Sequence, residues 1–203
     1  MELYRIAMVG DSNMEKLMEQ WEKENPTAKS HILLRFFGYG GARLGVGRDG
    51  ISFLDKYIDA IAAFNPDLAF CWIGGNNLGQ NIVRDGYAEN KYKEVFNLYM
   101  ELVNEINGRI VGKCIAMPQF PRTSLERWSP GMTWDHFYDQ VSKFNKMFRS
   151  RKIKRHRCYQ ISGKFFKRNG THWFDGVHLK YTHYGEIASD LMKEYVSKNI
   201  YHD

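Results

Sequence analysis

Short apolar runs alternate with longer amphipathic stretches along this chain of 203 residues. The run at 68–73 is continuously apolar, as expected of a strand that is buried on both faces of a sheet. The longer stretches place apolar residues at helical spacing, as Met14, Leu17 and Trp21 do. This alternation predicts an α/β protein, a three-layer sandwich in which helices cover both faces of a parallel sheet.

The pattern can be divided into individual elements. Strands are expected at 3–9, 32–37, 68–73, 110–117 and 158–161, which gives a five-stranded sheet. Helices are expected near 14–21 and over 51–64, 87–107, 133–150 and 182–197. Because no repeat, low-complexity tract or linker interrupts the pattern, we treat residues 1–203 as one domain. Ligands of such sheets bind beyond the carboxyl ends of the strands.

Composition excludes several classes of protein. Apolar residues make up 43% of the chain, which argues against disorder, and no run approaches the length of a membrane span. The N-terminus lacks the basic start and apolar run of a signal peptide, so we expect a cytoplasmic protein. Cys71, Cys114 and Cys158 are odd in number and far apart, which indicates reduced thiols and no zinc site.

The net charge of +6 is unevenly distributed. Residues 143–168 hold 11 Lys and Arg and no acidic residue, interleaved with aromatic side chains such as Phe144 and Phe165. A solvated basic face accounts for this pattern. The alternative is a surface that binds nucleic acid or another polyanion.

Two segments supply groups suited to acyl transfer. Ser12 lies between the first strand and the first helix, where a backbone N–H is free to donate to an anion. Either Asp11 or Ser12 could instead serve only as the N-cap of that helix. Asp175 precedes His178 by three residues, so its carboxylate can bond one imidazole nitrogen and leave the other to accept a proton from a hydroxyl. A surface histidine beside a capped turn is the alternative.

Two further segments supply hydrogen-bond donors after the second and third strands. Gly41, in a glycine-rich loop, lets a backbone N–H approach a ligand closely. Asn76, in Gly-Gly-Asn-Asn at 74–77, can donate its side-chain N–H to a developing oxyanion. Each segment alone is typical of an ordinary turn. Together the four segments offer a nucleophile, a base with its orienting carboxylate, and oxyanion donors.

This set of residues resembles the SGNH (GDSL-type) hydrolase family over nearly the whole chain. The four motifs of the family fall in order on Gly10-Asp11-Ser12, on Gly41, on Gly74-Gly75-Asn76, and on Asp175 with His178. The resemblance implies a flavodoxin-like sheet, an esterase- or lipase-type activity, and no metal or other cofactor. It also implies an oxyanion hole formed by the Ser12 and Gly41 N–H groups and the Asn76 side chain.

The expected function is therefore a serine esterase that acts on small or short-acyl carboxylic esters. Ser12 would be the nucleophile, His178 the base, and Asp175 the group that orients the base. One alternative is a catalytically weak module of the same fold that binds nucleic acid or another polyanion through 143–168. Another is an acyltransferase that uses the same triad.

Other residues are weaker candidates. Substrate contact is conceivable for Asp11, Asn13, Asn77, Arg122, Trp128 and Trp173. Arg122 and Trp128 belong to a loop after the fourth strand, which we expect to border the site. Asn13, Ala42 and Asn77 depart from the residues usual in the family, but none of these changes removes a catalytic group. A cluster of possible metal ligands is formed in sequence by His172, Asp175, His178 and His183, yet their spacing fits no metal-ligand pattern.

Overall fold

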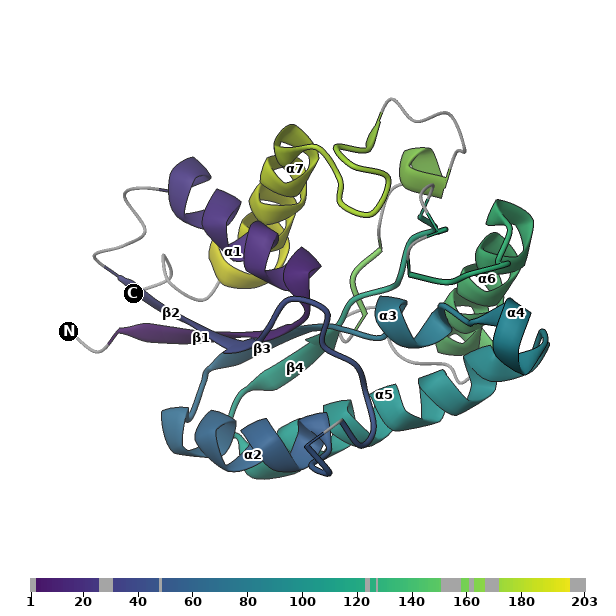
Figure 1. Ribbon diagram of the computed structural model, residues 1–203. Coiled ribbons are helices and arrows are strands. Elements are labelled where there is room, and N and C mark those ends of the chain that lie inside the picture. The colour runs from purple at the N-terminus through teal and green to yellow at the C-terminus, as the bar shows by residue number, and fades with distance from the viewer. Residues whose placement is uncertain are drawn as a thin grey trace.

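A parallel β-sheet lies between two layers of helices in the computed structural model of the chain (Figure 1). The structure describes residues 3–25, 31–47, 49–122, 125–126, 128–150, 158–160, 163–166 and 172–197. Within them, the predicted α/β class and three-layer arrangement are confirmed. None of the helices in these ranges is both long and apolar enough to cross a lipid bilayer.

The sheet brings the ends of all its strands to one edge. It consists of β1 (Tyr4–Gly10), β2 (Ile32–Gly38), β3 (Leu68–Trp72) and β4 (Lys113–Ala116), in the order β2-β1-β3-β4. All neighbouring strands are parallel. Gly10 is paired with Gly38 on one side and with Trp72 on the other, so the carboxyl ends of three strands lie level. A Cβ atom on Gly10 would lie 2.2 Å from the Trp72 carbonyl oxygen, so only glycine fits there.

The predicted fifth strand is wrong, because the described residues contain four strands. Cys158 makes only an isolated parallel bridge to Ala116, beside β4. The Tyr159 N–H donates to the Ala116 carbonyl oxygen at 2.9 Å. Cys158 and Tyr159 stand between Arg157 and the polar Gln160, so this apolar run has two residues and is too short to extend the ladder. Residue 161, the end of the predicted strand, lies outside the described residues.

One face of the sheet is covered by α1 (Ser12–Glu24) and α7 (Tyr181–Leu191), with a π-helical continuation η5 (Met192–Val196). The apolar residues of α1 recur every three to four positions, so they form a stripe along one side of the helix. That stripe buries Met14, Leu17 and Trp21 against Ile6 and Met8 of β1 and the residues around them. This packing fixes the N-terminus of α1 at the carboxyl end of β1.

The other face is covered by α2 (Phe53–Phe64), α5 (Lys91–Arg109) and α6 (Trp134–Ser150). Successive strand residues point to opposite faces, so Val9 and Cys71 pack on this side while Met8 packs on the other. Tyr99 of α5 donates its hydroxyl proton to the Cys71 carbonyl oxygen at the middle of this core. All three cysteines are free and buried.

Three short helical segments were not predicted: α3 (Gly75–Leu78), α4 (Ile82–Asp85) and the 3₁₀ turn η3 (Gly163–Phe166). Each has four residues, so none is long enough to show a hydrophobic period. The longer helices were predicted, although the predicted 87–107 begins four residues before α5 does. Of the three short segments, α3 matters most for the site, since it carries Asn76.

Candidate active site

A cavity of about 1180 Å³ opens at the carboxyl edge of the sheet. Its wall includes Ser12 after β1, Gly41 after β2, Asn76 after β3, Arg122 after β4, and His178 before α7. Each strand is thus followed by a residue of the cavity wall. The topology of a parallel sheet accounts for this convergence of residues far apart in sequence.

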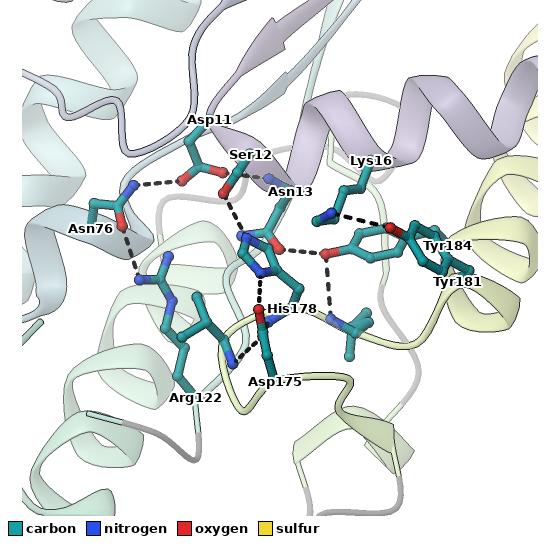
Figure 2. A network of polar contacts seen from close by, with 12 residues as sticks. Asp11, Ser12, Asn13, Lys16, Asn76, Arg122, Asp175, His178, Tyr181 and Tyr184 are labelled. Carbon is teal, nitrogen blue, oxygen red and sulfur yellow. Dashed lines mark hydrogen bonds and ion pairs between the residues drawn. The ribbon is translucent and has the colours of Figure 1, made fainter. Parts of the chain in front are cut away.

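Ser12 is the first residue of α1, and its hydroxyl is held by a histidine. Asp11 is the N-cap of the helix, because its Oδ1 accepts a hydrogen bond from the Asn13 N–H at 2.9 Å. The Ser12 side chain is therefore not used in capping. Its Oγ lies 2.8 Å from the Nε2 atom of His178 (Figure 2).

Asp175 holds the other nitrogen of the same imidazole ring. Its Oδ2 lies 2.7 Å from His178 Nδ1, and its Oδ1 accepts the backbone N–H groups of Val177 at 2.9 Å and His178 at 2.7 Å. Burial alone would raise the pKa of Asp175, but the hydrogen bonds from His178 and Val177 outweigh it and lower the pKa. An ionised Asp175 can only accept, so Nδ1 carries the proton and Nε2 is left to accept from Ser12.

All three residues predicted from the sequence to supply oxyanion donors, Ser12, Gly41 and Asn76, lie in the same wall. Gly41 adopts φ +79°, and no atom lies within 4 Å of the position that a Cβ atom would take. Within the described residues, neither the Gly41 N–H nor the Ser12 N–H has a hydrogen-bond partner. The Asn76 Nδ2 donates to the Ala42 carbonyl oxygen at 2.9 Å, and a longer contact of 3.3 Å leads to Asp11 Oδ2.

Two ionisable side chains of opposite charge, Asp11 and Arg122, are buried in contact with Asn76. Asp11 is 1% exposed and Arg122 is 5% exposed. Burial raises the pKa of Asp11, although the charge of Arg122 works in the other direction. Burial likewise lowers the pKa of Arg122, against the influence of Asp11. The Arg122 Nη1 donates to the Asn76 Oδ1 at 2.9 Å (Figure 2).

The weaker candidates from the sequence divide into two groups. Arg122 and Trp128 line the cavity. The other four do not line it, and each has a structural contact. Asp11 caps α1, and Asn13 accepts a hydrogen bond from the Tyr184 hydroxyl. Asn77 is hydrogen-bonded to the N–H and the carbonyl oxygen of Leu44, and Trp173 packs on Phe120. Substrate contact by these four therefore has no support from the structure.

Several residues of the cavity wall were missed by the sequence analysis. Tyr39 and Arg43 follow β2, and Lys56 comes from α2. The Lys56 ammonium lies 5.2 Å from the centre of the Tyr39 ring and 3.4 Å from a carboxylate oxygen of Asp49, another wall residue. The glycine-rich loop after β2 could have indicated Tyr39 and Arg43 as wall residues, because binding residues are often carried by loops beyond strand ends.

Two other sequence features contribute none of their described residues to the cavity wall. Residues 151–157, 161–162 and 167–168 of the basic segment 143–168 lie outside the described residues and hold seven of its 11 Lys and Arg, so the polyanion hypothesis stays a prediction. His172 Nδ1 and His183 Nε2 are 3.0 Å apart and pack against Phe165. Across the described part of the chain, no three His, Cys, Asp or Glu side chains are grouped to hold a metal ion.

Comparisons with known proteins relate the chain to ester hydrolases through its structure. Neither the protein-family models nor the curated proteins give a match to the sequence. Among solved structures, a GDSL-like lipase from Bacteroides thetaiotaomicron has a TM-score of 0.64 at 16% identity, over 96% of this chain and 88% of that one. A lipase from a goat rumen metagenome has a TM-score of 0.65 at 15% identity, over 95% of this chain and 97% of that one.

An acetylxylan esterase from Geobacillus stearothermophilus is also similar. Its TM-score is 0.57 at 15% identity, over 94% of this chain and 93% of that one. Catalytic mutants of that esterase replace a serine, an aspartate or a histidine by alanine, and the aspartate and histidine are three positions apart. At these identities the comparison establishes the fold. The chain has the fold of the SGNH (GDSL-type) hydrolases, as the sequence resemblance implied.

Proposed function

We propose that the protein is a serine hydrolase of small or short-acyl carboxylic esters. The observation that carries the proposal is the unbroken line of contacts from Asp175 through His178 to Ser12, with distances of 2.7 and 2.8 Å, at the wall of a cavity. The shared fold supports it, because the similar acetylxylan esterase has catalytic mutants at the same three residue types, with the same aspartate-to-histidine spacing.

The first step is acylation of Ser12. The Ser12 Oγ attacks the ester carbonyl carbon while its proton passes to His178 Nε2. The Asp175 carboxylate stabilises the imidazolium that forms. When the tetrahedral intermediate collapses, the bond to the leaving oxygen breaks and His178 protonates the departing alcohol. The acyl group remains on Ser12.

The second step is hydrolysis of the acyl-enzyme. A water molecule attacks the acyl carbon and gives a proton to His178 Nε2. Collapse of the second tetrahedral intermediate breaks the bond to Ser12, and His178 returns the proton to the serine oxygen. An acyltransferase would differ only in the acceptor, since an alcohol would then take the place of water.

Both tetrahedral intermediates carry a negative oxygen that needs donors. The Ser12 and Gly41 backbone N–H groups and the Asn76 Nδ2 are the donors we assign to it. Support comes from their common place on the cavity wall and from the two backbone N–H groups, which have no partner among the described residues. One proton of the Asn76 Nδ2 is donated to the Ala42 carbonyl oxygen at 2.9 Å. The other makes only a long contact of 3.3 Å with Asp11 Oδ2, and this is the proton that we assign to the oxyanion.

The direct test is hydrolysis of p-nitrophenyl acetate by the wild type and by Ser12→Ala. We expect kcat to fall by about 10⁴-fold or more in the variant, because the nucleophile is lost. Ser189→Ala is a matched control, since Ser189 is exposed on α7 and lies outside the cavity wall. Wild-type turnover in Ser12→Ala would contradict the assignment. Product analysis with an added alcohol acceptor separates hydrolysis from acyl transfer.

A further inference from the structure

The mechanism above leaves one buried cation without a role. Arg122 is 5% exposed and lies in the wall of the cavity. Among the described residues it makes no ion pair within 4 Å, and its hydrogen bond goes to an uncharged amide oxygen, Asn76 Oδ1. Burying a cation in this way costs stability. A position of that kind points to a role in the site rather than in the core.

The partners of Asn76 fix which way its side-chain amide points. An amide oxygen and an amide nitrogen are normally hard to tell apart, and the hydrogen-bond network must decide. Here Arg122 can only donate, and the Ala42 carbonyl oxygen can only accept. The oxygen of Asn76 must therefore face Arg122, and its nitrogen must face the Ala42 carbonyl oxygen and Asp11. Figure 2 shows the contacts with Arg122 and Asp11.

The turn after β3 is shaped to receive this guanidinium. A Cβ atom on Gly75 would lie 2.9 Å from Arg122 Nη2 and 3.2 Å from Gln119 Oε1. Gln119 is itself buried and donates to the Ile73 carbonyl oxygen at 3.0 Å. Any larger residue at 75 would push the guanidinium away from Asn76. The glycine next to Asn76 thus leaves the space that Arg122 occupies.

Arg122 also offsets a charge that opposes the reaction. Asp11 is buried, and one of its carboxylate oxygens lies 3.3 Å from the Asn76 nitrogen. A negative carboxylate beside an oxyanion donor would disfavour a second negative charge there. The positive charge of Arg122 lies on the opposite side of the same amide, where it reduces that repulsion.

We propose that Arg122 is a positioning residue, which holds the Asn76 amide with its N–H toward the oxyanion and compensates the buried charge of Asp11. The proposal rests on the proposed function for its catalytic consequence. It gives Arg122 a part in stabilising the transition state, whereas the sequence analysis considered it only for contact with substrate.

A double-mutant cycle tests whether Arg122 acts through Asn76. We expect kcat to fall by about 10- to 100-fold in Arg122→Gln with little change in KM, because Arg122 acts on a donor that is needed in the transition state. The two residues are in contact, so the effects of the two substitutions should be coupled. Asn76→Ala should lose about 10²–10³-fold in kcat. The double variant should be close to Asn76→Ala alone. Losses that multiply, or wild-type kcat in Arg122→Gln, would overturn the proposal.

Controls separate positioning from a general effect on folding. Arg109→Gln removes an arginine on α5 that pairs with Asp59 on the surface, and its kcat should match the wild type. Thermal unfolding identifies variants that do not fold. If Arg122→Gln does not fold, Arg122→Lys replaces it in the double-mutant cycle. Lysine keeps the positive charge but lacks the planar guanidinium.

A structural readout keeps this inference distinguishable from the esterase proposal. In a crystal structure of Arg122→Gln at atomic resolution, where amide nitrogen and oxygen can be distinguished, the Asn76 amide should turn away from the orientation set by its present partners. An unchanged Asn76 would overturn the positioning role, whatever the rates. If Asn76 turns but the wild type shows no Ser12-dependent hydrolysis, the positioning role stands and the proposed function fails.

Discussion

At the scale of single residues, the environment of Ser12 and His178 decides their chemistry. The chain has many serines and seven histidines, but this histidine joins a serine hydroxyl on one side to an anchored carboxylate on the other. Asp175 is fixed by two backbone N–H groups as well as by the ring. The imidazole is therefore held in one tautomer and one orientation.

Replacing Asp175 by Asn should leave the fold in place and remove most of the activity. The amide can donate to Nδ1 and so favours the wrong tautomer of His178, and we expect kcat to fall by about 10⁴-fold. Steady-state kinetics with p-nitrophenyl acetate would measure this. A kcat within a few-fold of the wild type would contradict the role given to Asp175.

The same variant has a pH signature in stability. The pKa of Asp175 lies below its ordinary value of 3.8, because its hydrogen bonds outweigh burial. The Asp175 carboxylate therefore stabilises the folded state at pH values above its ordinary pKa, and this stabilisation is lost as the pH falls through the lowered pKa. The difference in unfolding free energy between wild type and Asp175→Asn should shrink toward acid pH. Denaturant unfolding at several pH values measures this difference, and its growth at acid pH would contradict the sign.

At the scale of elements, strands and long helices could be predicted because their hydrophobic periods are long. The predicted strand at 32–37 differs from β2 by one residue, and the predicted helix at 51–64 begins two residues before α2. Segments without a hydrophobic period were not predicted correctly. The helix α3 was missed because it is too short to show a period, and the strand predicted at 158–161 is only a bridge at Cys158. Local pattern alone does not report how far a ladder extends.

The loop after β2 offers a prediction at this scale. Gly41 has φ +79°, a conformation that other residues adopt at a cost. Gly41→Ala should lower the unfolding free energy by about 1 kcal/mol and also lower kcat, because the backbone N–H shifts. Gly108→Ala is the matched control, since Gly108 lies in helix α5 with open space around it. That control should be neutral or stabilising, and its kcat should not change.

If Gly41→Ala kept full stability and full kcat, the loop would not need this backbone conformation. If stability fell while kcat did not, the Gly41 N–H would have no part in binding the oxyanion. Chemical denaturation and steady-state kinetics on the same samples distinguish these results.

At the scale of the whole molecule, the site exists because a parallel sheet gathers distant segments at one edge. The order of motifs along the chain was enough to expect Ser12, Gly41, Asn76, Asp175 and His178 near each other. The burial of Arg122 was beyond sequence reasoning, because it depends on the turn after β3 and on Gln119, which only tertiary packing brings together. An arginine in a loop normally indicates a solvent-exposed side chain.

The central claim is that Ser12 is the nucleophile. The most direct measurement is covalent labelling with a fluorophosphonate, followed by intact-mass analysis and peptide mapping. We predict one adduct for each chain, located on Ser12, absent in Ser12→Ala and formed much more slowly in His178→Ala. An adduct on a different residue, or a wild type that hydrolyses p-nitrophenyl acetate without becoming labelled at Ser12, would contradict the account.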